Sequence, residues 1–200
     1  MSVAPAVRHS QTIALPPPRT GQAITLMQAL KQRRSTREFA QKPLSRATLS
    51  TLLWAACGIN RPDGGGRTAP SAHNWQEISV YAALADGLFR YDAAEHSLRP
   101  VAAGDLRALT GIQDFAGHAP LDLVYVADFS RMSEAGADER VFLAAVDTGV
   151  IAQNVYLYCA AAGLATVVRG LVDRKALAAA MNLGLHERIM LAQTVGFPAA

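Results

Sequence analysis

This sequence of 200 residues has few of the residues from which disulfides and metal centres are built. Its two cysteines, Cys57 and Cys159, lie far apart among apolar neighbours and form no CxxC pair. Cysteines in such surroundings are usually buried and reduced, so we expect two buried thiols rather than a disulfide or a reactive site. The five histidines are scattered and match no zinc spacing, which leaves no candidate set of metal ligands.

Several catalytic and nucleotide-binding motifs are also missing. The sequence has no GxSxG motif for serine hydrolysis, and no GxGxxG motif follows an expected strand. The run GGGRT, residues 64–68, lacks the GK[ST] ending of a phosphate-binding loop, and we expect no strand before it. The sequence therefore argues against a serine hydrolase, a Rossmann dehydrogenase and a nucleoside triphosphatase.

Charged residues are scarce, at 18% of the chain, and they are unevenly placed. The net charge of +3 divides into +6 for residues 1–42 and −3 for residues 43–200. A basic feature confined to the N-terminal part is unlike the charged face of a nucleic-acid-binding protein. Half of the residues are hydrophobic, yet polar residues interrupt the longest apolar run, so we expect a globular chain without a membrane span.

The chain divides into a short leading segment and one domain. Residues 1–22, which contain Pro16, Pro17 and Pro18, have no periodic apolar pattern and are predicted to be extended. No second linker or internal repeat follows, so residues 23–200 are predicted to form a single domain. The leading segment lacks the layout of a secretory signal, which favours a cytoplasmic protein; a periplasmic one is the alternative if a signal peptide has been removed.

The apolar periodicity predicts an α+β fold, with a mixed central sheet flanked by helices. The nearly continuous apolar run 121–129 is expected to be a central strand, and Asp86-Gly87 is expected to turn a hairpin. Residues 60–74 are expected to form a long irregular loop. We expect helices at 25–32, 46–57, 139–162 and after Asp173, strands at 78–85, 87–91, 164–172 and 188–195, and weak helical character at 104–115. The helix 139–162 is apolar on almost every side, so either its own domain or a partner subunit must cover it.

Two motifs are candidates for binding chemistry. RRSTREF, residues 33–39, crowds arginines around the Ser35 hydroxyl, and guanidinium groups suit phosphate because they offer paired donors in one plane. The alternative, which composition alone favours, is a solvated helix end whose arginines interact with the helix dipole. RTAPSAHNWQ, residues 67–76, offers amides suited to a heteroaromatic ring, or else is a polar loop over a core Trp75.

In order and spacing, these motifs resemble the nitroreductase family of FMN-dependent oxidoreductases, from about Thr25 to Pro198. The resemblance also includes Gln153-Asn154 in the long helix, GLATVVRG after it and VGFP near the end, while RTAPSA is similar to the SagB-type dehydrogenases. It implies a homodimer with two FMN molecules at the subunit interface, where the long helix is covered by its counterpart.

The resemblance also implies which residues bind the cofactor. The basic motif would bind the FMN phosphate, ribityl chain and pyrimidine edge, Asn74 would bond the isoalloxazine, and the amides after the long helix would approach N5. His73 would face the substrate or the surface. No protein group would be catalytic, because the flavin carries the chemistry. The expected cofactor-binding residues are Arg33, Arg34, Ser35, Arg37, Asn74, Gly163, Leu164 and Ala165.

The implied reaction is a ping-pong reduction, in which NAD(P)H reduces the flavin, leaves, and is replaced by a small organic acceptor such as a nitroaromatic or a quinone. Two alternatives are a SagB-like flavin-dependent dehydrogenase or oxidase of heterocycles, and a flavin- or anion-binding protein without turnover. Many relatives have a basic stretch after the segment that corresponds to VGFP, and here no cation follows Pro198. The phosphate is therefore expected to depend on Arg33 and Arg37, with Arg169 or Arg67 as substitutes.

Overall fold

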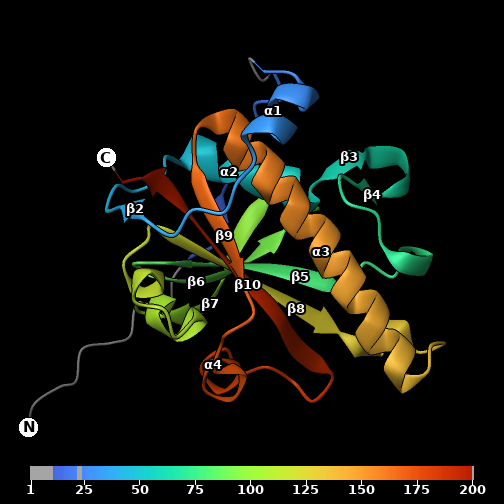
Figure 1. Cartoon of the computed structure of the whole chain (residues 1–200). Helices are drawn as coiled ribbons and strands as arrows, with labels where there is room; N and C mark the ends of the chain where they lie inside the picture. The colour runs from blue at the N-terminus through green and yellow to red at the C-terminus, as the bar shows by residue number, and fades with distance from the viewer. Residues whose placement is uncertain (1–10, 22–23, 200) are drawn as a thin grey trace, which may run out of the picture.

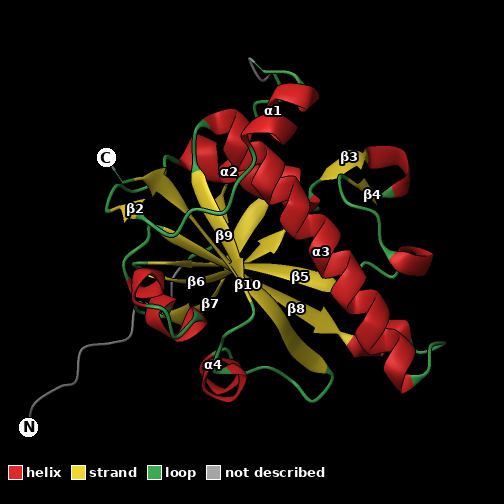
Figure 2. Ribbon diagram, in the orientation of Figure 1, coloured by secondary structure: helices red, strands yellow, loops and turns green. Residues whose placement is uncertain are grey.

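An eight-stranded sheet organises the computed structural model, which describes residues 11–21 and 24–199 (Figures 1 and 2). The strands follow the order β1-β7-β6-β5-β8-β10-β2, and β9 also pairs with β10; every pairing in the described residues is antiparallel. This confirms the α+β fold. The strands are β1 (Ile13–Ala14), β2 (Phe39–Ala40), β3 (Ile59–Arg61), β4 (Gly66–Arg67), β5 (Ile78–Leu84), β6 (Gly87–Asp92), β7 (Ser97–Ala103), β8 (Leu121–Asp128), β9 (Ala165–Arg169) and β10 (Glu187–Pro198). The helices are α1 (Leu26–Gln32), α2 (Arg46–Cys57), α3 (Ala137–Ala162) and α4 (Arg174–Ala180).

The predicted caps of α1, α2 and α4 and the predicted end of α3 are confirmed, whereas α3 begins at Ala137, two residues before the expected start. The hydroxyl of Thr25 accepts a hydrogen bond from the Gln28 amide at the start of α1, and Ser45 does the same for α2. Gly163 ends α3 in the left-handed conformation, with φ +68°. Asp173 caps α4 by accepting from the Ala176 amide at 3.0 Å. Local capping chemistry therefore fixes the ends of these helices.

Two segments differ from the expectation. Strand β7 was not predicted, because Arg99 and Pro100 interrupt its apolar pattern. Only the first two residues of β7 pair with β1, so the rest of the strand is a sheet edge, where a proline is tolerated. Residues 60–74 are not wholly irregular, because β3 and β4 form a small hairpin, so a short strand does precede the glycine run. Residues 104–115 contribute only short 3-10 turns.

Both faces of the sheet are buried, which explains the nearly continuous apolar sequence of β8. Leu121, Leu123 and Tyr125 belong to the core beneath α2 and α3. Val124 and Val126 point to the other face, where they pack with residues of α4. The two thiols, Cys57 and Cys159, are buried and free as predicted.

The described part of the leading segment is extended and lies against the domain. Ile13 and Ala14 pair with the start of β7, and Leu15 is buried in the core. Further along, the amide of Arg19 donates to the Thr51 hydroxyl at 3.0 Å. Residues 11–21 are thus docked on the domain, and the boundary expected between residues 22 and 23 lies outside the described residues.

Helix α3 crosses one face of the sheet along a diagonal (Figure 1). Among the described residues it is the helix that is long and apolar enough to cross a membrane, a test that core helices also pass. Ala144, Ile151 and Val155 are buried in the core, whereas the side chain of Phe142 is 66% exposed. The domain therefore covers one face of α3 and leaves part of its apolar surface open.

Candidate functional site

A cavity of about 430 Å³ lies where the ends of α1 and α3 meet the start of β9, in the upper part of Figure 1. Five of the predicted cofactor-binding residues line it together, although they come from two distant parts of the sequence. They are Arg33, Arg34, Gly163, Leu164 and Ala165. The folded chain thus brings the basic motif and the segment after the long helix to one site.

The basic motif is fixed to the domain on both sides. The amide of Arg33 donates to the Ala29 carbonyl at 2.9 Å and closes α1. The amide of Thr36 donates to the carbonyl of Thr166 in β9 at 3.0 Å. Directly afterwards, β2 pairs with the end of β10. These backbone bonds hold residues 33–36 along the cavity.

Tyr156 of α3 connects the two motifs, and sequence analysis missed it. Its hydroxyl accepts a hydrogen bond from the amide of Val168 at 3.0 Å and lies 2.8 Å from the Ser35 hydroxyl. The guanidinium of Arg33 lies 5.3 Å from the centre of the same ring, within cation–π range. The sequence did contain a signal, because Tyr156 lies in a helix that was expected to be covered. A tyrosine hydroxyl that is buried needs a hydrogen-bond partner.

The cavity carries positive charge that is not neutralised within it. Lys31, Arg33 and Arg34 line it, and its lining contains no aspartate or glutamate. The guanidinium groups of Arg33, Arg34 and Arg37 have no hydrogen-bond acceptor or carboxylate partner within residues 11–21 and 24–199. Such a cluster is suited to an anion with several oxygen atoms, and the residues present fit the phosphate of FMN.

Gly163 contributes by its backbone conformation. A Cβ atom there would meet no atom within 4 Å, so no steric contact demands glycine, but the positive φ of +68° does. The turn directs the chain from α3 into β9 and places the backbone of Leu164 and Ala165 at the cavity.

Asn74 and His73 lie elsewhere in the chain. Their loop is anchored to α3 through Asp147, whose carboxylate accepts from the Ala72 amide at 2.8 Å. Asp147 and Tyr156 are nine positions apart, which corresponds to about 14 Å and about two and a half turns of helix, so the two side chains leave α3 on opposite sides. The side-chain carbonyl of Asn74 accepts a hydrogen bond from the side-chain amide of Gln76 at 3.0 Å, and the exposed His73 ring stacks on Trp75. Within a single chain, Asn74 therefore does not line the cavity that contains Arg33 and Arg34.

The contacts of Arg169 rule it out as a substitute phosphate ligand. Arg169 is 4% exposed and bonds the Asp122 carboxylate at 2.7 Å and the Thr110 carbonyl at 2.8 Å, so the core consumes its donors. Arg67 donates to the side chain of Gln76 at 2.9 Å, away from the cavity. The expectation that Arg169 could complete the phosphate site is wrong, whereas Arg67 lies outside the lining of this chain's cavity and its role stays a prediction. Arg37 is exposed and lies outside the lining of the cavity.

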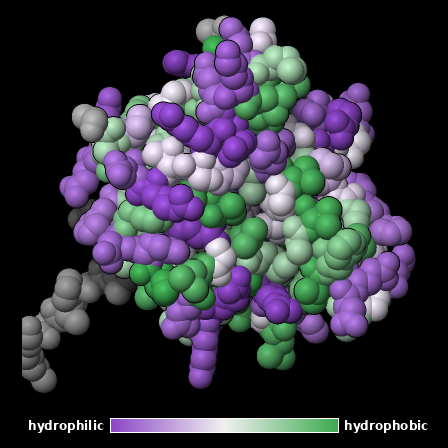
Figure 3. Space-filling model, in the orientation of Figure 1, coloured by the Kyte–Doolittle hydropathy of each residue, from purple (hydrophilic) through white to green (hydrophobic). Residues whose placement is uncertain are grey.

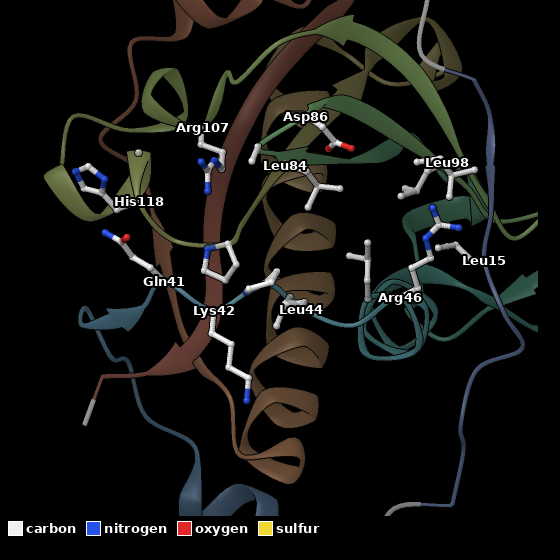
Figure 4. Close-up of a pocket in the computed structure, with 16 residues that line it drawn as sticks. Leu15, Gln41, Lys42, Leu44, Arg46, Leu84, Asp86, Leu98, Arg107 and His118 are labelled. Atoms are coloured by element: carbon white, nitrogen blue, oxygen red, sulfur yellow. The ribbon is translucent and has the colours of Figure 1, made fainter.

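A larger cavity of about 510 Å³ lies between β1, α2 and the turn after β5, and it contains none of the predicted site residues (Figure 4). Its cations are mostly engaged: Arg107 bonds Asp105 through two nitrogens, and Lys42 lies 4.4 Å from the centre of the Phe197 ring. Its floor is made of leucines such as Leu15 and Leu49. Its size alone does not make it the candidate site.

Comparison with known proteins agrees with the motifs at the smaller cavity. The family model described as "Nitroreductase family" matches residues 30–197. A Methanocaldococcus jannaschii protein provisionally named a nitroreductase is 32% identical over 157 residues, which cover 74% of this chain and 79% of that protein. A crystal structure of a provisionally named nitroreductase from Ralstonia eutropha JMP134 is 50% identical, with a TM-score of 0.91, 97% of this chain covered and 92% of that one. The NADPH:FMN oxidoreductase of Vibrio harveyi, complexed with NAD+, shares the fold at 20% identity, with a TM-score of 0.64, 88% of this chain covered and 69% of that one.

Replacing Tyr156 with Phe is expected to destabilise the domain by about 1–2 kcal/mol, because the Val168 amide and the Ser35 hydroxyl lose their shared partner. Urea unfolding measures the change. Tyr158→Phe is the matched control on the same helix. Its hydroxyl lies 3.4 Å from the Thr48 carbonyl, too far for a strong bond, so the loss should be clearly smaller. Equal losses in the two variants would contradict the connecting role of Tyr156.

Proposed function

Because this chain belongs to the nitroreductase family of oxidoreductases, we propose that it is an FMN-dependent enzyme that uses NAD(P)H to reduce a small organic acceptor by a ping-pong scheme. The acceptor class is a nitroaromatic or a quinone. The observation that carries the proposal is the cavity in which Arg33 and Arg34 meet the backbone after Gly163 without any acidic neighbour. The dependence of the proposed reaction on NAD(P)H favours a cytoplasmic location for the enzyme.

The residues at the cavity have separate roles in this proposal. Arg33 and Arg34 bind the phosphate, with Lys31 adding positive charge. Tyr156 holds the Arg33–Ser35 segment in place through its ring and its hydroxyl. The backbone of Leu164 and Ala165 faces the ring system. When bound, FMN supplies the two-electron chemistry, so no side chain of this chain has to act as acid or base at the reacting atoms.

A homodimer completes the site in this proposal. The open surface of α3 is apolar at Phe142 and Val146, which are 66% and 45% exposed, and Figure 3 shows hydrophobic side chains along it. An apolar helix face of this kind is suited to a second copy of the same helix. Since Asn74 and the arginines lie on different sides of α3, such a pairing lets the loop of one protomer reach the cavity of its partner.

The absorption spectrum of the purified protein is the first test. We expect the flavin bands, and we expect excess anaerobic NADH or NADPH to bleach them. A colourless protein that cannot be reconstituted with FMN would contradict the proposal. Bound FMN that neither nucleotide bleaches would instead favour the SagB-like oxidation of heterocycles or binding without turnover.

Replacing Arg33 with Ala is expected to weaken FMN binding by about 1.5–3 kcal/mol, the scale of a charge-assisted hydrogen bond. Titration of the apoprotein with FMN, followed by flavin fluorescence, measures the affinity. Arg19→Ala removes a cation from the leading segment and serves as the control with unchanged affinity. An unchanged affinity in Arg33→Ala would refute the phosphate assignment.

Sedimentation velocity at micromolar concentration is expected to show a dimer. Phe142→Glu should shift the protein towards monomer, because it places a charge in the apolar surface of α3. Leu185→Glu changes another exposed apolar residue, beyond α4, and should leave the dimer intact. Only monomers in the wild type, or the same shift in both variants, would rule out this interface.

A further inference from the structure

Two carboxyl groups are buried together beneath the loop of residues 70–76, and the binding set above does not use them. Glu77 directly follows the loop; its side chain is fully buried, and neither carboxyl oxygen has a hydrogen-bond partner in the described part of the chain. Asp147 of α3 is 5% exposed and neighbours Glu77. A buried carboxylate next to a second one is costly unless something neutralises it.

The neighbouring cations do not bond to these carboxyl groups. Arg131 directs a guanidinium nitrogen to the backbone carbonyl of Gln76, at 2.6 Å. Arg67 donates to the side chain of Gln76 at 2.9 Å. Both arginines hold the end of the loop, and the positive charge of Arg131 acts on Glu77 without a hydrogen bond to it. Charge on Glu77 is therefore not compensated by an ion pair.

The remaining neighbours supply no further charge or ligand. Cys57 of α2 is neutral, because burial raises the pKa of its thiol to about 11. Asp128 of β8 turns its carboxylate to the Ser130 hydroxyl and amide. Within the described residues, no third acid, histidine or cysteine joins the pair to make a metal site. A proton is the remaining means of relieving the repulsion.

The environment favours that proton on Glu77. Burial is the main cause that raises the pKa of its carboxyl group to about 7, and the charge of Asp147 raises it further. Asp147 has a structural task of its own, because it accepts the amide of Ala72 at 2.8 Å.

The loop that this bond anchors is strained. His73, Asn74 and Gln76 have φ values of +49°, +56° and +49°, in the left-handed region that is uncommon for residues other than glycine, although histidine and asparagine adopt it more readily than glutamine. The Ala72 amide immediately precedes His73 and Asn74, so the Asp147 carboxylate acts where the strain begins.

We propose that Glu77 keeps a proton in the folded chain, and that this neutral carboxyl group lets neighbouring Asp147 position the Ala72–Asn74 segment for the cofactor. They are positioning residues, since neither reaches the cavity. The proposal rests on the proposed function for its effect on FMN, but the proton on Glu77 is a property of the chain without cofactor. When the proton is lost, the two charges repel and Asp147 loosens its hold on Ala72.

The sign of the pH dependence follows from the raised pKa. The folded chain binds this proton more tightly than the unfolded chain, whose Glu77 has the ordinary value of 4.5. The stability that the proton contributes is complete below about pH 4.5 and is lost as pH rises to about 7. Above about pH 7, FMN affinity should fall as well.

The test compares Glu77→Gln with the wild type, because glutamine keeps the shape of the side chain and cannot ionise. Wild-type FMN affinity should fall by about tenfold between pH 6 and pH 9, the usual scale of coupling between sites, and Glu77→Gln should not show this fall. Thermal unfolding of the apoprotein should lose stability from about pH 5 to 7 in the wild type and lose clearly less in the variant. Exposed Glu134→Gln is the control that keeps the wild-type profile, and Asp147→Asn should weaken FMN at every pH.

The outcomes separate this proposal from the proposed function. The same pH profiles in Glu77→Gln and the wild type would overturn the proton on Glu77. A protein that binds no FMN at any pH would overturn the proposed function, and the unfolding profiles would still decide the proton on Glu77. If Glu77→Gln fails to fold, NMR titration of the wild-type protein labelled with 13C-glutamate decides the question. One glutamate carboxyl group that titrates near pH 7 would support the proton on Glu77. Titration of all of them below about pH 5 would overturn it.

Discussion

The packing of α3 across the sheet is the constraint on which the rest of the structure depends. A helix of 26 residues is rigid over its whole length, so groups attached at two points keep a fixed separation. Tyr156 attaches the basic motif near the C-terminal end, and Asp147 attaches the Ala72–Asn74 segment nearer the N-terminal end. The helix thus sets both the place of the cavity and the distance between the two predicted halves of the cofactor site.

The charged groups of the protein divide into those that the core uses and those that it leaves available. Arg169 and Asp122 are bonded to each other and to neighbouring threonines, although one carboxylate oxygen of Asp122 has no partner among the described residues. Breaking such a buried pair costs about 3–5 kcal/mol. Arg33 and Arg34 have no comparable partner among the described residues, and they lie at a cavity. The guanidinium group therefore stabilises the core at Arg169 and offers an anion site at Arg33 and Arg34. The difference lies in the residues that surround each arginine.

Sequence reasoning was strongest where local chemistry decides the structure. The caps Thr25, Ser45 and Asp173 and the helix end at Gly163 lie where their residue types predict, because capping bonds involve residues only a few positions apart. It was weaker where partners are distant. β7 escaped detection because its stability comes from pairing with β6 and not from its own pattern. Tyr156 was missed because its partners lie more than a hundred positions before it and twelve after it.

The sequence by itself determined the α+β class, the helix ends, the central place of β8 and the motifs that mark the family, since these depend on periodicity and on residue types at short spacing. Only the tertiary structure decided which cations are free. It engaged Arg169 in the core, joined RRSTREF to the segment after Gly163, and placed Asn74 on another side of α3. The physical reason is that burial and pairing belong to the three-dimensional neighbourhood of a side chain, and no spacing along the chain encodes that neighbourhood directly.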